Sequence, residues 1–199
     1  FDYLKEGEIG IEQFGITVQD EFGQTGQGVF SFQIEGVNDA PVALVDTAEV
    51  LENGAIDLAA ASSVLGDDVD VDGDALTVAS IRTGNVEAAD GTEGAIGGTL
   101  VGTYGTLTLN ADGQYSYAAT ASAVDGLAAG ITAVDVFTYT ITDGTLSASA
   151  ELQITVTGVN DAPVALVDTA EVLENGAIDL ASASSVLGDD VDVDGDALT

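Results

Sequence analysis

The chain has 199 residues and carries 35 acidic side chains against only two basic ones, which gives a formal net charge of −33. This charge excludes most nucleic-acid and anionic-membrane partners, because both need a basic surface. The absence of Cys and His also excludes Ser-His-Asp catalysis, Cys-His catalysis and zinc sites built from these residues, so we expect no enzyme.

Six segments of the middle of the chain have the alternating or β-branched pattern of strands. In chain order they are 43–51, 76–81, 105–109, 114–118, 136–142 and 148–157. Turn pairs separate them, such as Asp112-Gly113 and Asp143-Gly144, which are typical of β-hairpins. The best candidate for a short helix is 118–129, but glycines interrupt it. We expect about seven strands in one sandwich, with a core that includes Val136, Phe137 or Tyr139, Ile141, Leu152, Ile154 and Val156.

Two alternative classes fit this composition less well. Acidic chains with few aromatic residues are often disordered, but 46% of these residues are hydrophobic and they recur at strand spacing. No apolar run approaches the roughly 20 residues that span a bilayer, so we expect no membrane insertion. No signal peptide opens the sequence, and we expect the targeting information to lie outside it.

An almost verbatim internal repeat divides the chain. The segment 36–77 returns at 158–199 with Ala60 replaced by Ser182 as the single difference, and the period is 122 residues. This period suits one sandwich domain in a tandem array. The segment QFGITVQD at 13–20 is similar in sequence to VFTYTITD at 136–143, which extends the repeat to the N-terminal part of the chain. We therefore expect residues 1–36 to end one repeat, 37–158 to form a complete repeat, and 159–199 to begin the next.

The densest acidic cluster is GDDVDVDGDALT, in which Asp68, Asp70, Asp72 and Asp74 alternate. Its first half resembles an EF-hand loop, but the twelfth position is Ala79 instead of Glu, and a strand follows, so an EF-hand is rejected. Oxygen ligands in loose geometry suit Ca²⁺. The nearest additional oxygen donors are Glu52 and the pair Asn38-Asp39. A solvated acidic face is the alternative, since Asp favours turns, but two basic residues cannot neutralise the cluster.

The order LVGTYGTLTLNADGQYSY, VDVFTYTITDG, LQITVTGVNDAPVA resembles the VCBS-type, bacterial cadherin-like repeat of giant type I-secreted RTX adhesins. The resemblance covers essentially the whole chain, although the RTX nonapeptide motif GGxGxD is absent. It implies an all-β fold of immunoglobulin- or cadherin-like β-sandwich repeats in tandem, an extracellular, secreted cell-surface location, and Ca²⁺ binding.

The same resemblance implies a grouping of ligands at each junction between repeats. GVNDAP is similar to the cadherin linker DxNDxxP and DVDGD to the cadherin DxD loop, which bind Ca²⁺ together with a Glu of a preceding turn. Gly36 stands where that linker has its first Asp, and Asp20 or Asp143 could replace it. The upstream junction would use Asn38, Asp39, Asp70 and Asp72. The downstream junction would use Asn160, Asp161, Asp192 and Asp194, with Asp143 or Glu52 from the preceding repeat. The remaining repeat equivalents are Glu174, Asp190 and Asp196.

Two functions remain open at this stage. The first is a Ca²⁺-stiffened extender whose partners are the adjacent repeats of the same chain, with neighbouring chains as further candidates, in an adhesin or a matrix filament. The second is an adhesive module that itself binds cell-surface glycans or a partner. The near-identity of the two copies suits a spacer, but weak binding repeated over many copies would gain avidity.

Overall fold

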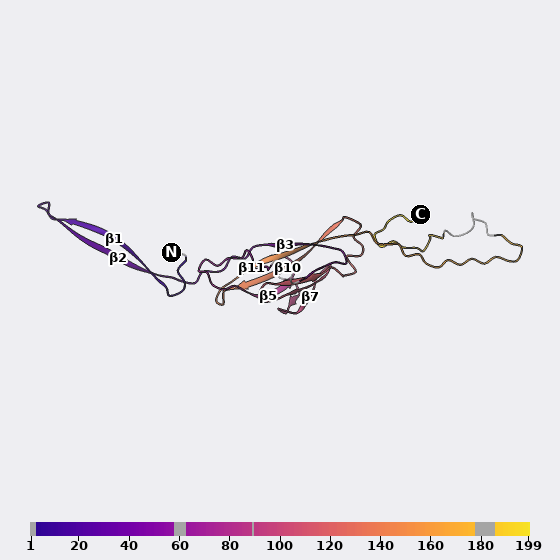
Figure 1. Cartoon of the computed structure of the whole chain (residues 1–199), viewed down its shortest axis with the longest axis horizontal. Helices are drawn as coiled ribbons and strands as arrows, with labels where there is room; N and C mark the ends of the chain where they lie inside the picture. The colour runs from indigo at the N-terminus through magenta and orange to yellow at the C-terminus, as the bar shows by residue number, and fades with distance from the viewer. Residues whose placement is uncertain (1–2, 58–62, 89, 178–185) are drawn as a thin grey trace.

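A computed structural model describes residues 3–57, 63–88, 90–177 and 186–199. Its three parts follow one another along one long axis: a two-stranded hairpin, a β-sandwich and an extended C-terminal segment (Figure 1). These described residues form strands, turns and irregular segments but no helix. No helix long and apolar enough to cross a membrane is therefore found among them. Residues 120–130, within and just beyond the candidate helix, are turns and irregular backbone that follow the end of β9.

The N-terminal hairpin pairs β1 (Ile9–Gln19) with β2 (Thr25–Glu35) in an antiparallel register. One face is apolar, because alternate residues of each strand point the same way. Phe14, Phe30 and Phe32 lie on this face, with Phe14 and Phe32 stacked at a centroid distance of 5.8 Å. All three rings are exposed, and nothing in the described part of the chain covers them.

The sandwich consists of two sheets, as the sequence predicts. The five-stranded sheet has the order β3-β11-β10-β5-β6 and the four-stranded sheet the order β4-β9-β8-β7. The strands of the first sheet are β3 (Asp46–Leu51), β5 (Thr77–Thr83), β6 (Glu93–Gly94), β10 (Thr132–Thr142) and β11 (Ser147–Thr157). Those of the second are β4 (Ala55–Ile56), β7 (Thr99–Val101), β8 (Thr106–Leu109) and β9 (Tyr115–Ala118).

The core lies between these sheets and is built from alternate residues of their strands. Phe137 packs edge-on against Tyr117, with the ring centroids 6.2 Å apart. The predicted core residues Phe137, Tyr139, Ile141, Leu152, Ile154 and Val156 are all fully buried. Val136 is the exception: it is only half-buried, because the period of two that turns Phe137 inward turns Val136 to the other face of β10.

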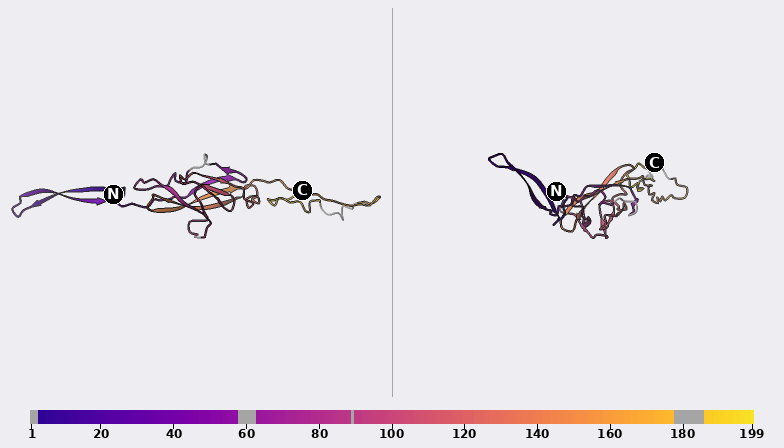
Figure 2. Two further views of the ribbon diagram at one scale, coloured as in Figure 1. Left: turned by 90° about the horizontal axis from the view of Figure 1, so that it is seen from below. Right: turned by 60° about the vertical axis from the view of Figure 1, so that its left-hand side comes forward.

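The direction of the strands decides which loops meet at each end of the sandwich. β10 and β11 are antiparallel neighbours, whereas β3 runs parallel to β11. The β10–β11 turn therefore lies at the end where β3 starts, and the turn after β3 lies at the end where β11 finishes. Figure 2 shows the hairpin beyond the first end and the C-terminal segment beyond the second. We call these the upstream end and the downstream end.

The C-terminal segment repeats the local structure of the stretch that leads into the sandwich. Val42 pairs with Val69 through an isolated antiparallel bridge, and Val164 pairs with Val191 in the same way. The left-handed backbone also recurs at Asn53 and Asn175, with φ of 57° and 64°. The near-identical sequences thus share this bridge and this turn, whereas residues 168–173, the equivalents of β3, form no strand.

Candidate metal centres at the two ends of the sandwich

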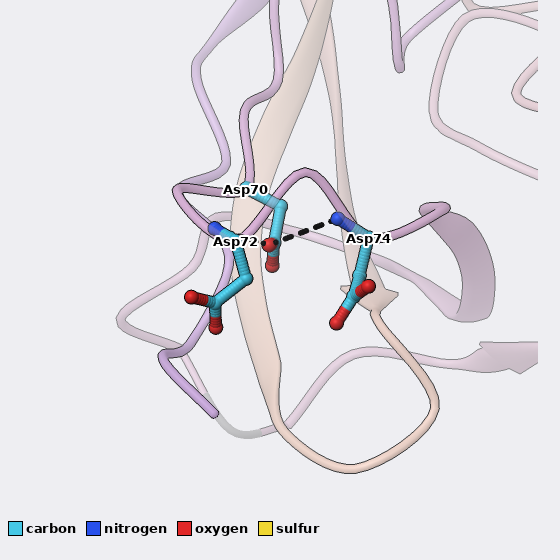
Figure 3. A group of neighbouring side chains, drawn as sticks. All are labelled: Asp70, Asp72 and Asp74. Atoms are coloured by element: carbon cyan, nitrogen blue, oxygen red, sulfur yellow. Dashed lines mark hydrogen bonds between the residues drawn. The ribbon is translucent and has the colours of Figure 1, made fainter. Parts of the chain in front are cut away.

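The acidic loop at the upstream end brings together Asp70, Asp72 and Asp74, whose carboxylate oxygens lie within 4.8 Å of one another. Asp70 Oδ1 accepts hydrogen bonds from the backbone N–H groups of Asp72 and Asp74, at 3.0 and 3.2 Å. Figure 3 shows the three side chains on the turn, with the bond from the Asp74 amide drawn. Gly73 has a φ of 72°, which a glycine adopts without a steric penalty. The chain therefore turns sharply enough to place these side chains together.

The linker residues Asn38 and Asp39, which the sequence predicts as further oxygen donors, make hydrogen bonds at this end of the sandwich. The Asp39 amide donates to Asp72 Oδ2 at 2.8 Å, and the Asn38 side-chain amide donates to Asp143 Oδ2 at 2.9 Å. The bond from Asn38 and the amides of Leu146 and Thr145 lower the pKa of Asp143. Asp143 therefore lies at the upstream end of its own sandwich.

Two oxygens of this upstream cluster are buried without a hydrogen-bond partner among the described residues: Asp70 Oδ2 and Asp72 Oδ1. The Asp72 residue is 5% exposed. A buried carboxylate oxygen that no donor satisfies costs free energy, since it has lost its contact with water. This arrangement is the one that a bound cation would stabilise.

Asp68 does not join the cluster, although it shares the alternating pattern. Its Oδ1 accepts the Leu44 amide at 2.8 Å, and both of its carboxylate oxygens lie 3.4 Å from the Tyr139 hydroxyl. Burial raises the pKa of Asp68. In the second copy Asp190 makes the same bond, to the Leu166 amide. These residues anchor the acidic loop to the chain that enters the repeat, and neither belongs to the group of Asp70, Asp72 and Asp74 or to that of Asp192, Asp194 and Asp196.

The downstream end repeats the upstream cluster. Asp192, Asp194 and Asp196 form a second group within 4.8 Å. Asp192 Oδ1 accepts the amides of Asp194 and Asp196 at 3.1 and 3.2 Å, and Asp194 Oδ2 accepts the Asp161 amide at 2.8 Å. The Asn160 side chain donates to the Asp161 carbonyl at 2.8 Å.

Glu52 is the residue that joins the sandwich to this downstream group. It lies in the turn after β3, is 4% exposed, and accepts the Val159 amide on Oε2 at 2.9 Å. Burial raises the pKa of Glu52, the Val159 amide opposes this, and the neighbouring charges of Asp161 and Asp194 raise it further. The sequence left Asp143 and Glu52 as alternatives for this junction, and the structure places Glu52 here.

Three oxygens at this downstream junction are buried and lack a hydrogen-bond partner in the described part of the chain: Glu52 Oε1, Asp161 Oδ2 and Asp194 Oδ1. They come from the sandwich, the linker and the segment that follows. Glu174, the repeat equivalent of Glu52, is exposed and lies outside this group.

A third carboxylate group was not foreseen from the sequence. The partly buried Asp46 lies beside Tyr139, which also contacts Asp68, and in the second copy Asp168, Asp189 and Asp190, the equivalents of Asp46, Asp67 and Asp68, have oxygens within 4.8 Å of one another. A single Asp at the start of a strand gives no signal of such a partner.

The model of the bacterial cadherin-like domain family matches residues 38–158. The chain is 31% identical over 140 residues to the calcium-binding lectin RapA2 of Rhizobium johnstonii, and this match covers 69% of the chain and 55% of the relative. The family description and the name of this relative are those of binding modules, not of enzymes.

Solved structures similar to the chain include two endo-fucoidan hydrolases of glycoside hydrolase family 107, MfFcnA4 and MfFcnA9. Their TM-scores are 0.29 and 0.27, with 20% and 19% identity. The matches cover 75% and 74% of this chain but only 19% and 22% of those chains. A likeness this slight carries no argument about activity. With the family model matching residues 38–158 and the predicted sandwich present, the chain belongs to the bacterial cadherin-like domain family.

Proposed function

We propose that the chain is a calcium-stiffened extender of a secreted surface adhesin or matrix filament, acting in cell adhesion or biofilm formation. In this proposal residues 1–36 end one repeat, 37–158 form a complete repeat, and 159–199 begin the next. Each junction binds Ca²⁺, and the partners of a repeat are its neighbours in the same chain. The location is extracellular, at the cell surface.

One observation carries the proposal: at one junction, buried carboxylate oxygens of Glu52, Asp161 and Asp194 have no hydrogen-bond partner among the residues that the structure describes. These groups belong to the sandwich, the linker and the following segment. The charges of Asp161 and Asp194 act on the Glu52 carboxyl, and neighbouring like charges repel one another unless a cation is present. An ion held by all three would remove the freedom of a linker of a few residues, which is otherwise a hinge.

Ca²⁺ is the cation that fits these donors best. All of them are oxygens, there is no His or Cys in the sequence, and Ca²⁺ accepts six to eight oxygens in flexible geometry. The relative RapA2 is calcium-binding by name, which supports the same choice. Extracellular calcium modules work at a dissociation constant of about 10⁻⁴–10⁻³ M, so modest affinity suffices.

Small-angle scattering of the 199-residue chain, with Ca²⁺ and with a chelator, tests the proposal. We expect the maximum dimension to be larger and better defined with Ca²⁺, and the double variant Asp192→Ala with Asp194→Ala to lose the part of this response that comes from the downstream junction. Glu49→Gln, which removes an exposed carboxylate of β3, is the matched control and should respond like the parent chain. Identical scattering with Ca²⁺ and chelator would leave only a solvated acidic surface.

The second candidate is an adhesive module that binds glycans or a partner directly, and the name of the relative RapA2 as a lectin favours it. A glycan array probed with residues 37–158 distinguishes the two. Binding at millimolar concentration or tighter by this single repeat favours the module, whereas no binding together with a Ca²⁺-dependent change in shape favours the extender.

A further inference from the structure

The two acidic loops have the same backbone structure, so any difference between them comes from their neighbours. In each loop the first Asp accepts the amides of the second and third, at 3.0–3.2 Å. In each, a linker amide donates to the middle Asp at 2.8 Å. Asp72 and Asp194 each have one buried oxygen without a partner among the described residues.

The segments that pass beside the two loops also correspond. Gly36 packs so tightly on the backbone carbonyls of Leu4 and Lys5 that a Cβ would collide with both, and Gly158 packs in the same way on those of Leu127 and Ala128. The Gly7 amide donates to the Gly36 carbonyl at 3.0 Å, and the Gly130 amide donates to the Gly158 carbonyl at 2.9 Å. Lys5 at the upstream end therefore corresponds to Ala128 at the downstream end.

The side chains at these two positions differ in charge. The Lys5 ammonium donates a hydrogen bond to Asp74 Oδ1 and forms an ion pair with it. The methyl group of Ala128 has no charge to offer Asp196. One of the two basic residues in the whole sequence is thus bound to the acidic loop of one junction and not of the other.

We propose that Lys5 is a built-in counter-charge that weakens divalent-cation binding at the upstream junction and makes the two junctions unequal. The ammonium neutralises one of the three carboxylates and occupies an oxygen that an ion would need. It also repels a divalent ion held by Asp70 and Asp72. This inference rests on the proposed function, because it assumes that these clusters bind Ca²⁺.

The size of the effect follows from the charges. A unit charge about 5 Å from a divalent ion in a solvent-exposed site changes its affinity by roughly tenfold. Since the Lys5 side chain is 45% exposed, a larger effect is not expected. If the two junctions are otherwise equal, the upstream junction should therefore bind Ca²⁺ about tenfold more weakly than the downstream junction.

Calorimetric Ca²⁺ titration of the 199-residue chain tests the inference, with one junction disabled at a time. Asp194→Ala leaves the upstream junction to be measured, and Asp72→Ala leaves the downstream one. On the first background Lys5→Ala should tighten binding about tenfold. On the second background Ala128→Lys should weaken it by a similar factor. Arg82→Ala on the first background removes the same charge from the other basic residue, which donates to the carbonyls of Asn85 and Val86, and it should leave the affinity unchanged.

The outcomes separate the inference from the function on which it rests. Unchanged affinity in Lys5→Ala, with Ca²⁺ binding intact on both backgrounds, overturns the role of Lys5 and leaves the proposed function standing. Equal tightening by Lys5→Ala and Arg82→Ala also overturns it, since net charge alone would then explain the effect. If neither background binds Ca²⁺ and the parent chain does not bind it, the proposed function fails. Thermal melts in chelator check that each variant folds.

Discussion

The hydroxyl of Tyr139 lies 2.8 Å from a carboxylate oxygen of Asp46, inside the sandwich, and 2.7 Å from the carbonyl of Leu44. Burial raises the pKa of Asp46 from 3.8 to about 6, and the charges of Asp67 and Asp68 add to this, while the bond from Tyr139 opposes it. A hydroxyl has one hydrogen to donate, so protonated Asp46 can donate to Tyr139 while Tyr139 donates to Leu44. The cluster therefore links folding to pH.

The sign of this linkage follows from the raised pKa. The folded chain binds the proton more tightly than the unfolded chain, so the contribution to stability is fully present below about pH 4 and is lost as the pH rises through about 6. We expect Asp46→Asn, measured in chelator, to gain about 1 kcal/mol at pH 8 and nothing at pH 4, a figure reduced because Asp46 is only half-buried. Denaturant unfolding at both pH values measures this. The control Glu49→Gln, on the exposed side of β3, should gain nothing at either pH.

Glu52→Gln should remove the calcium response of the downstream junction. In chelator the variant should be more stable than the parent, because an unpaired charge no longer lies buried beside Asp161 and Asp194. In Ca²⁺ at about 100 times the dissociation constant it should lack the roughly 2.7 kcal/mol that binding adds to the parent. Calorimetric melts with and without Ca²⁺ test both expectations. The matched variant is Glu174→Gln, whose side chain is exposed, and a loss of response there would contradict the assignment.

Asp135 is a buried acceptor whose replacement should destabilise the sandwich. It is 3% exposed and accepts the amides of Thr103 and Tyr104 at 3.0 Å and the Tyr117 hydroxyl at 2.9 Å. Asp135→Asn places an NH₂ group against one of these donors, and we expect a loss of about 2 kcal/mol. Tyr117→Phe removes one donor and should cost about 1 kcal/mol. Denaturant titration that finds Tyr117→Phe the more damaging of the two would refute this reading.

In the 199-residue chain taken alone, the apolar face of the β1–β2 hairpin predicts association in solution, because Phe30 and Phe32 correspond at the 122-residue period to Leu152 and Ile154, which are buried in the core of the sandwich. Its exposed rings form a continuous patch, and such patches tend to mediate contact with other molecules. Phe14→Ser with Phe32→Ser should weaken self-association at least about tenfold. Val29→Ser, on the opposite face of the hairpin, is the control and should leave it unchanged. Sedimentation equilibrium over a range of concentrations gives the comparison.

The sequence was sufficient for the strands whose own alternation is strong. β8, β9, β10 and β11 lie within one to four residues of the predicted ranges. The two-residue strands β4 and β6 were not predicted, because they exist through pairing with β9 and β5 and have no pattern of their own. The predicted strand over 43–51 starts only at Asp46, since Val42 pairs with Val69 and the Leu44 amide bonds to Asp68.

For the candidate sites too, the sequence predicted what depends on neighbouring residues but not what depends on contacts between residues far apart in the chain. Alternating Asp residues beside a Gly predicted that Asp68, Asp70, Asp72 and Asp74 converge, and the last three of them do. They could not show that Asp68 is bound by Leu44 and Tyr139, which are far away in the sequence. The choice between Asp143 and Glu52 depended on strand direction across the sheet, which local spacing does not encode.

The parallel pairing of β3 with β11 also has a mechanical consequence. The chain enters the sandwich at the start of β3 and leaves it at the end of β11, and six residue pairs, from Asp46–Leu152 to Leu51–Thr157, join the two strands. Tension applied along a filament therefore pulls these strands past each other lengthwise. All of their hydrogen bonds bear the load together and must break at once, whereas in an antiparallel hairpin pulled at its open end they would separate one by one.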